Sequence, residues 1–364
     1  MKTRAALFYG AGEALQVAEI DLEEPSSGEV LVSMAACGVC GTDLHVVKGE
    51  WQRPTPMVLG HEGAGVVAAV GEGVTTLAPG DRVVLSWALS CGECADCRRH
   101  SPAACLALQR AIGAGTLIDG RTGMSLNGET IYRGTATGAL IEQLVVPERA
   151  ALPLPAAISL EEAALLGCAA LTGVGAVLFA ARVEPGSSVV VIGAGGVGQF
   201  VVQGARIAGA SEIVCADPLE NRREQALRCG ATVAVGPEEL AATIAELLPD
   251  GADHAFDAVG DPATTAAALR STRSGGLCTI VGLPAAGARL DLDPAELTRR
   301  EKRLQGTMYG SEDPATALPV LLEHVRAGRL DLRSQLGPTF PLDRVNDAFE
   351  AALAGAAGRV LVTP

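Results

Sequence analysis

An apolar run that leads into a glycine-rich turn and then a helical stretch constrains the fold of this chain most. Val189 to Ile192 run directly into Gly193-Ala194-Gly195-Gly196-Val197-Gly198, and small and apolar residues follow at helical spacing. A lone Gly-x-Gly-x-x-Gly is weak support, but here a strand precedes it, a helix follows it and Asp217 closes the next apolar run. This order predicts the parallel, doubly wound sheet of a Rossmann domain.

Each glycine of this turn has its own task in holding a dinucleotide. Gly193 permits the tight turn, Gly195 lets a pyrophosphate approach the backbone, and Gly198 brings the helix and the strand close together. The helix N-terminus, including Gly196 and Val197, offers free N–H groups to the anion. The turn therefore predicts a dinucleotide cofactor.

Asp217 and Arg222 bear on which dinucleotide is bound. Asp217 can accept hydrogen bonds from both ribose hydroxyls of the adenosine and would repel a 2′-phosphate, so we predict NAD rather than NADP. Arg222 and Arg223 lie nearby, and their positive charges could weaken the preference for NAD over NADP. The alternative interpretation of Asp217 is an ordinary turn residue before Pro218.

Four closely spaced cysteines predict a metal site. They form a C-x2-C-x2-C-x7-C run in a chain whose opening residues lack the layout of a signal peptide. Thiolates at such spacing can surround one ion tetrahedrally, so we predict a closed structural zinc site. The alternatives are two disulfides, which rarely persist in a reducing cytosol, or four unrelated buried thiols. The predicted ligands are Cys91, Cys94, Cys97 and Cys105, in the loop 91–105.

Length and charge limit the classes of function. A chain of 364 residues exceeds what a single core usually supports, which favours two domains. The net charge of -14, without any Lys/Arg run, argues against binding nucleic acid or an anionic membrane surface. No apolar stretch reaches the roughly 20 residues that span a bilayer, so we expect a soluble, cytoplasmic protein.

The pattern of apolar and turn-forming residues along the chain predicts where the domains begin and end. Short apolar runs punctuated by Gly, Pro and Asp are typical of antiparallel strands, and they fill the first 150 residues. Ser159-Leu160-Glu161-Glu162 is typical of a helix start. The segment 106–138 is long, polar and glycine-rich, so we expect a surface excursion there. We predict a β-rich domain over 1–158, a Rossmann domain over 159–307 and a return to the first domain over 308–364.

A second set of cysteines with a histidine predicts a reactive metal centre. Cys37 and Cys40 precede His61, and Cys168 opens the edge of the nucleotide domain. Two sulfurs and one imidazole leave one position on zinc open, as catalytic zinc requires. Spacing alone neither proves that these residues meet nor chooses between Cys37 and Cys40.

Together these motifs resemble the zinc-dependent medium-chain alcohol dehydrogenases over essentially the whole chain. The resemblance implies an α/β protein in which a GroES-like, mostly β catalytic domain accompanies the Rossmann domain. It also implies two zinc ions per chain and hydride transfer between NAD and an alcohol/aldehyde pair. The matching pieces are Gly38-Val39-Cys40 with Thr42-Asp43, Gly60-His61-Glu62, the four-cysteine loop, Gly167-Cys168, and the glycine-rich turn with Asp217.

The resemblance also assigns the residues around the catalytic zinc. Its ligands would be Cys40, His61 and Cys168, while Cys37 becomes a bystander. Glu62 would lie beside the ion as a neighbouring or transient ligand.

Four further residues receive roles from the resemblance. Thr42 would hydrogen-bond the alcohol oxygen, and His45 would pass the proton through the nicotinamide ribose toward solvent. The alternative for His45 is a half-exposed histidine at a strand end. Thr172 is expected near the nicotinamide, and Arg359 is expected against the pyrophosphate.

The only two tryptophans bear on the substrate. The resemblance puts Trp51 and Trp87 on the wall of the substrate cleft, which favours slim or flat primary alcohols, including allylic or aromatic ones. The alternative is that each fills a gap in the core.

Two other functions remain candidates. One is a formaldehyde dehydrogenase that acts on a thiol adduct, although Gln109 stands where the glutathione-dependent enzymes carry arginine. The other is a non-catalytic NAD-binding protein of the same fold. The resemblance also implies a homodimer, with a homotetramer as the alternative, that assembles through the sheet edge at 277–283 and 302–309.

Overall fold

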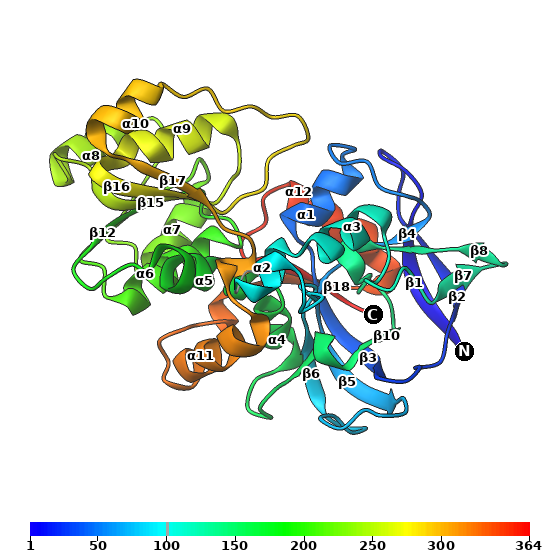
Figure 1. Cartoon of the computed structure of the whole chain (residues 1–364). Coiled ribbons are helices and arrows are strands. Elements are labelled where there is room, and N and C mark those ends of the chain that lie inside the picture. Colours follow the sequence, from blue (N-terminus) through cyan, green and yellow to red (C-terminus); the bar gives the residue numbers. More distant parts are fainter. Residues whose placement is uncertain (100–101) are drawn as a thin grey trace. The chain divides into compact units, whose positions relative to one another are not determined.

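The computed structural model describes residues 1–99 and 102–364, which form two compact units (Figure 1). His100 and part of the predicted 91–105 loop lie outside the described residues. Unit 1 comprises Met1–Cys168, Asp313–Ala315 and Leu332–Pro364. Unit 2 comprises Ala169–Glu312 and Thr316–Asp331.

These ranges differ from the predicted domain boundaries at two places. Helix α4 (Leu160–Leu166) belongs to unit 1, because it packs on three strands of that unit. Most of α11 (Pro314–Arg326) belongs to unit 2, where the side chain of Gln203 exchanges two hydrogen bonds with the backbone of Asp331.

Unit 2 is built on a six-stranded parallel sheet with the order β14-β13-β12-β15-β16-β17. This is the strand order of the Rossmann fold, in which the sequence order of the strands reverses between β12 and β15 while all strands stay parallel. The predicted fold class is therefore confirmed. The strands are β12 (Ser188–Ile192), β13 (Glu212–Ala216), β14 (Val233–Val235), β15 (Ala252–Asp257), β16 (Thr272–Ile280) and β17 (Arg303–Gly306).

Strand β12 is apolar from Val189 to Ile192 because helices cover both faces of its sheet. Successive side chains of a strand point to opposite faces. Accordingly, Val189 and Val191 belong to one buried cluster, while Val190 and Ile192 belong to another. Figure 1 shows α6 (Gly198–Ala208) and α7 (Glu220–Cys229) on one face, and on the other face α8 (Leu240–Leu247), α9 (Pro262–Ser271) and α10 (Pro294–Arg300).

Unit 1 contains two mostly antiparallel sheets that share a large hydrophobic cluster. The seven-stranded sheet has the order β11-β6-β5-β3-β19-β18, with β10 also paired to β3. Its strands are β3 (Glu29–Gly38), β5 (Glu62–Val70), β6 (Arg82–Leu85), β10 (Gln143–Pro147), β11 (Ala151–Pro153), β18 (Leu336–Pro341) and β19 (Arg359–Thr363). The second sheet joins β1 (Lys2–Phe8), β2 (Gln16–Leu22), β4 (Met57–Val58), β7 (Met124–Leu126), β8 (Glu129–Thr130) and β9 (Tyr132–Arg133).

The segment 106–138 is not the surface excursion that we expected. It contributes α3 (Leu106–Ala114) and strands β7 to β9, and Ile131 within it is fully buried. The cause is Arg133, also buried, whose guanidinium donates hydrogen bonds to the carbonyls of Thr122, Thr137 and Val145. Because these bonds satisfy a buried cation, the segment is held inside the unit.

The strand register of unit 1 brings distant residues to one place. Gly38, at the end of β3, pairs with Glu62 of β5 on one side and with Leu361 of β19 on the other. A Cβ atom on Gly38 would lie 2.2 Å from Oε2 of Glu62. Glycine at this position therefore makes room for the Glu62 side chain.

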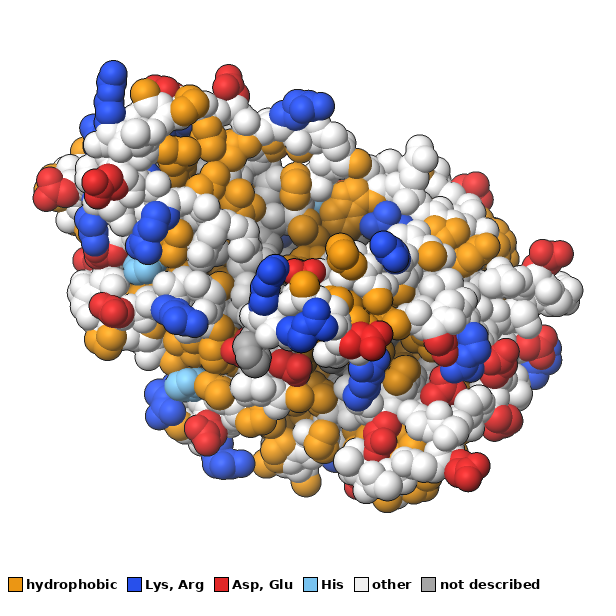
Figure 2. Space-filling view, viewed as in Figure 1, with side chains coloured by type: hydrophobic (Ala, Val, Ile, Leu, Met, Phe, Trp, Pro, Cys, Tyr) orange, Lys and Arg blue, Asp and Glu red, His pale blue; other side chains and the backbone are white. Residues whose placement is uncertain are grey.

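No single helix in the described parts of the chain has the length and apolarity of a membrane span, and only the bent pair of α4 with Ala169–Ala181 passes that test together. Figure 2 shows acidic and basic side chains interspersed with apolar ones over the face in view. The pairing of two copies through the sheet edge at β17 stays a prediction.

Candidate active site

Four buried side chains of unit 1 point their donor atoms at one another. One ligand atom from each of Cys40, His61, Glu62 and Cys168 lies within 4.8 Å of all the others. Cys37 is outside this group, and its Sγ instead donates to the carbonyl of Gly38. The structure therefore brings Cys40, and not Cys37, to the predicted catalytic metal position.

Chain turns between regular elements supply these donors. Cys40 is the N-cap residue of α1 (Gly41–Val47), and His61 and Glu62 stand where β5 begins. Cys168 lies between α4 and α5 (Ala169–Gly175). Because none of the four lies inside a helix, each side chain can turn toward the common centre.

Asp43, for which no role was predicted, links the α1 end of the site to the β5 end. Its Oδ2 accepts a hydrogen bond from the backbone of Cys40 at 3.1 Å, and its Oδ1 accepts one from Gly60 at 3.0 Å. Oδ1 also lies 3.4 Å from Nδ1 of His61. The other ring nitrogen, Nε2, is thus left for a metal ion, an arrangement common among metal-binding histidines. The only sequence signal is an acid at the third position of a short helix.

Arg359 contacts Glu62, which differs from the predicted contact with a pyrophosphate. Its Nε lies 3.0 Å from Oε2 of Glu62, and its Nη1 donates to the carbonyl of Val39 at 2.9 Å. The physical reason is the burial of Glu62, whose side chain has no exposed surface. A carboxylate in such a place needs a cation nearby.

The cluster perturbs the ionisation of its own members. The contact with Cys168 lowers the pKa of the Cys40 thiol, with Arg359 and His61 adding to this effect, and the same contact with burial raises the pKa of Cys168. Burial alone would lower the pKa of His61, but Asp43 and Cys40 raise it well above its usual range. One thiolate is thus favoured before any metal binds.

Glu62 supplies a test of whether a metal ion fits here. Burial raises its pKa to about 7, even though Arg359 works in the opposite direction. Among the described residues, its Oε1 has no hydrogen-bond partner. Zinc in proteins accepts a donor set of this kind, namely two sulfurs, an imidazole and a carboxylate oxygen that has no hydrogen-bond partner. The residues present therefore fit a zinc ion.

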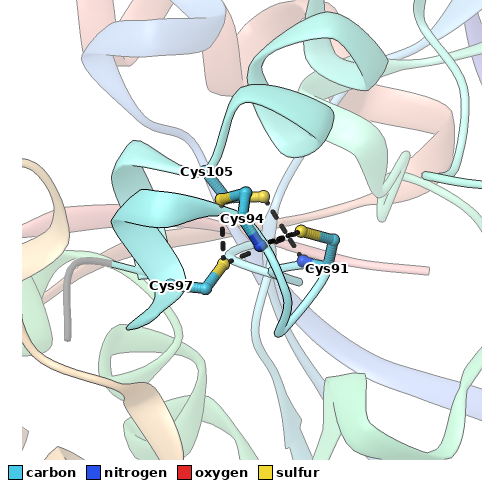
Figure 3. A group of neighbouring side chains, drawn as sticks. All are labelled: Cys91, Cys94, Cys97 and Cys105. Atoms are coloured by element: carbon cyan, nitrogen blue, oxygen red, sulfur yellow. Dashed lines mark hydrogen bonds between the residues drawn. The ribbon is translucent and has the colours of Figure 1, made fainter. Parts of the chain in front are cut away.

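The four-cysteine loop forms a second group of donors (Figure 3). The sulfurs of Cys91, Cys94, Cys97 and Cys105 all lie within 4.8 Å of one another, and Sγ of Cys94 is 3.4 Å from that of Cys97. The backbone N–H groups of Cys91 and Cys94 donate to the sulfurs of Cys105 and Cys91. Hydrogen bonds from Cys97 lower the pKa of Cys94 to about 6, which favours a thiolate. Cys91, Cys94, Cys97 and Cys105 form no disulfide with one another, so the disulfide alternative has no support.

The glycine-rich turn of unit 2 has the geometry that its sequence predicts. Gly193 has a φ of +91°, and a Cβ atom on Gly198 would lie 1.8 Å from the carbonyl oxygen of Gly193. A Cβ on Gly195 would meet only Arg222, at 3.9 Å. Gly195 therefore leaves open space beside the backbone, while Gly198 fits helix against strand. Gly196 and Val197 follow directly before α6.

Asp217 is buried at the end of β13 and is fixed by the same turn. Its Oδ2 accepts a hydrogen bond from the backbone of Ala194 at 2.8 Å, and its Oδ1 accepts one from Leu219 at 2.9 Å. Nη1 of Arg222 lies 4.0 Å from Oδ2. The carboxylate is thus oriented at the edge of the turn, and it has a basic neighbour.

The predicted relay and pocket residues lie in several elements. Thr42 and His45 are both half-buried in α1, and the ring of Trp51 stacks on the imidazole of His45 with centroids 4.6 Å apart. Trp87 is buried after β6 of unit 1, and Thr172 is buried in α5 of unit 2. Thr42, His45, Trp51 and Trp87 thus belong to unit 1, and Thr172 belongs to unit 2.

Comparison with known protein families gives two matches that together cover most of the chain. Residues 26–156 match the alcohol dehydrogenase GroES-like domain, and residues 196–323 match the zinc-binding dehydrogenase domain. The first match contains Cys40 and His61, and the second begins inside the glycine-rich turn.

Individual proteins similar to this chain cover its whole length. The chain is 37% identical to an S-(hydroxymethyl)glutathione dehydrogenase of Escherichia coli, over 100% of both chains. A crystal structure of an alcohol dehydrogenase zinc-binding domain protein from Burkholderia ambifaria superposes with a TM-score of 0.94 at 33% identity, covering 100% of this chain and 99% of that one. Benzyl alcohol dehydrogenase from Acinetobacter calcoaceticus also superposes with a TM-score of 0.94, at 28% identity and the same coverage.

Proposed function

Because the chain belongs to the zinc-dependent medium-chain alcohol dehydrogenase family, we propose that it oxidises a primary alcohol to an aldehyde and transfers the hydride to NAD. Family membership makes the protein an oxidoreductase, and the substrate class, NAD and the site roles are the content of the proposal. The observation that carries it is the buried donor set of Cys40, His61 and Cys168 beside Glu62.

In this proposal the protein holds its metal through residues that it has already oriented. Cys40, His61 and Cys168 bind zinc, and Asp43 keeps the imidazole of His61 turned so that Nε2 faces the ion. When bound, zinc supplies Lewis-acid chemistry, which favours loss of the hydroxyl proton of an alcohol and polarises the carbonyl in the reverse direction. Glu62, paired with Arg359, stays beside the ion as a neighbouring or transient ligand.

Two residues of α1 are assigned to proton transfer. Thr42 and His45 are three positions apart in the helix, so their side chains project from the same face. The Thr42 hydroxyl hydrogen-bonds the alcohol oxygen, and His45 passes the proton on to water. His45 suits this task because its side chain is 23% exposed and so reaches solvent.

The nicotinamide cofactor is assigned to unit 2. NAD supplies the hydride acceptor, and the amide groups of Gly195, Gly196 and Val197 at the start of α6 bind its pyrophosphate. Asp217 accepts hydrogen bonds from the adenosine ribose. Thr172 lies near the nicotinamide in this proposal, on a helix that packs against α6.

Aromatic side chains favour a flat substrate. Trp51 and Trp87 line the pocket, which selects slim or flat primary alcohols, with allylic and aromatic alcohols as the preferred class. The similarity to benzyl alcohol dehydrogenase supports this class. So does the stacking of Trp51 on His45, because it ties a pocket residue to the relay.

A second candidate is oxidation of a thiol adduct of formaldehyde. The relative that carries the name S-(hydroxymethyl)glutathione dehydrogenase favours it. Against it, the amide of Gln109 donates to the carbonyl of Ala103 at 2.8 Å, so this side chain is engaged by the short 3-10 helix before α3. It also carries no charge for a carboxylate of the adduct.

The test is an absorbance assay of NADH formation with benzyl alcohol, allyl alcohol, ethanol, a bulky secondary alcohol, and formaldehyde with glutathione. We expect the highest kcat/KM with benzyl or allyl alcohol, and a larger loss for benzyl alcohol than for ethanol in Trp51→Ala. Comparable turnover of the bulky secondary alcohol contradicts the substrate class, and fastest turnover of the thiol adduct favours the second candidate. Metal analysis is the check on a non-catalytic NAD-binding protein: about two zinc ions per chain support the enzyme, and one or none supports the non-catalytic protein.

A further inference from the structure

The chain folds back over His45 directly after α1. Gly49 has a φ of +75°, and the backbone N–H groups of Glu50 and Trp51 both donate to the carbonyl of His45, at 2.9 and 3.3 Å. A Cβ atom on Gly49 would lie 2.8 Å from Cβ of Ala11. The left-handed backbone and this close approach both require glycine, so the reversal of the chain is fixed.

This reversal of the chain brings one side chain against the edge of the His45 imidazole ring and another against its face. On the edge, Nδ1 is hydrogen-bonded to Oε2 of Glu50. On the face, the indole of Trp51 stacks at an interplanar angle of 16°, and the guanidinium of Arg53 lies 5.6 Å from the indole centroid. The side chains of His45 and Glu50 are 23% and 34% exposed, so water reaches the pair.

We propose that Glu50 is a positioning residue that fixes His45 in the tautomer with its proton on Nδ1. An ionised carboxylate can only accept hydrogen bonds, so Nδ1 must be the donor in this contact. In the neutral ring the second nitrogen, Nε2, then carries the lone pair. Without such a partner, a neutral histidine side chain favours the proton on Nε2, so the carboxylate selects the minor form.

The selected tautomer is the one that a proton relay needs. The inference rests on the proposed function, in which His45 takes up the proton of the alcohol. Nε2 accepts that proton, and the imidazolium keeps Nδ1–H on Glu50 through a charge-assisted hydrogen bond. Nε2 then releases the proton to water, and both Glu50 and His45 return to their starting states. The stacked Trp51 keeps the ring plane fixed throughout.

The tautomer can be measured directly on the zinc-loaded, full-length protein by nitrogen-15 NMR of labelled histidine. His45→Gln assigns the signal, Glu50→Leu removes the acceptor, and Glu129→Leu removes an exposed carboxylate elsewhere in unit 1 as the matched control. We expect the Nδ1–H form of His45 in wild type and in Glu129→Leu, and mainly the Nε2–H form in Glu50→Leu. An unchanged tautomer in Glu50→Leu, at unchanged melting temperature and zinc content, overturns the inference.

Kinetics separate a positioning role from a structural one. We expect kcat for alcohol oxidation to fall on the order of 10- to 100-fold in Glu50→Leu, with little change in KM, because loss of a positioning residue costs less than the roughly 10²- to 10⁴-fold that a general acid or base itself contributes. A small diffusible base such as imidazole should restore part of this loss, as it should in His45→Gln, and should leave wild type and Glu129→Leu unchanged. Loss of kcat without rescue by the base contradicts the positioning role. If wild type oxidises no alcohol, the proposed function and the relay fail together, while the tautomer still reports whether Glu50 controls His45.

Discussion

Nε of Arg359, in β19, lies 3.0 Å from Oε2 of Glu62, in β5, and the two side chains are 9% and 0% exposed. Burial alone would lower the pKa of Arg359, but Glu62 and the thiols of Cys40 and Cys168 raise it. The guanidinium therefore stays protonated. The pair therefore places a permanent cation next to the candidate metal centre, on the side of Glu62.

Removing Arg359 is expected to destabilise the protein strongly. Arg359→Leu leaves Glu62 buried without its partner, which typically costs about 3–5 kcal/mol of unfolding free energy. Urea unfolding in zinc-containing buffer measures this, with Arg149→Leu, an exposed arginine of unit 1, as the control. The double variant Glu62→Gln/Arg359→Leu should lose less than the sum of the single variants. Strict additivity contradicts the coupling.

The carboxyl group of Glu62 should make the metal-free protein sensitive to pH. Its pKa in the folded state is about 7, against an ordinary value of 4.5, so the folded state favours the neutral acid. Stability from this group is fully present below pH 4.5 and is lost as the pH rises to about 7. The total is about 3 kcal/mol, because one pKa unit corresponds to about 1.4 kcal/mol.

The melting temperatures of chelated wild type and Glu62→Gln measure this effect. The advantage of Glu62→Gln should grow between pH 4.5 and 7 and stay constant above, while Glu129→Gln, at an exposed site, should show no such trend. Saturating zinc should reduce the advantage, since a divalent cation stabilises the carboxylate. A difference that is independent of pH refutes the assignment.

The four-cysteine loop should hold one zinc ion independently of the catalytic centre. Cys97→Ser is expected to lower the zinc content from about two ions to about one per chain and to make the loop sensitive to protease, because three thiolates bind zinc less tightly than four. Elemental analysis and limited proteolysis report these changes. Cys229→Ser alters a buried thiol outside both donor groups and should leave the zinc content unchanged.

Asp217 should control the choice between NAD and NADP. Asp217→Asn removes the negative charge but keeps an oxygen that can accept the hydrogen bond from Ala194, so the glycine-rich turn is preserved. With Arg222 nearby, we expect the ratio of kcat/KM for NADP to that for NAD to rise on the order of 10-fold. Asp250→Asn, at an exposed position of unit 2, is the control. An unchanged ratio of kcat/KM values means that Asp217 does not recognise the adenosine ribose of the cofactor.

Sequence alone predicted those structural features whose residues all lie in one continuous stretch of the chain. The strand, the turn and the helix around Gly193 to Gly198 are contiguous, so their steric roles could be predicted from order alone. The same holds for the four cysteines. The helix start at Ser159 to Glu162 was also predicted correctly, since the Ser159 hydroxyl accepts a hydrogen bond from the backbone of Glu162 in the same turn.

Contacts between distant strands could not be predicted in this way. The partner of Arg359 depends on the register of β3, β5 and β19, and the sequence carries no signal for that register beyond Gly38. The resemblance, and not spacing, chose Cys40 over Cys37. Glu50 was missed because its role depends on the chain reversal at Gly49, where neither residue stands out in a single sequence.

The whole of unit 2 lies in the sequence between α4 and β18 of unit 1. The antiparallel pairing of β3 with β19 therefore has to close a loop that contains the entire parallel sheet, and long loops close slowly when they are unstructured. We expect prior folding of unit 2 to compact that loop and to speed the closure. We therefore expect a weakened parallel sheet to delay the contact of Arg359 in β19 with Glu62 at the candidate metal centre, to which that sheet contributes no donor atom.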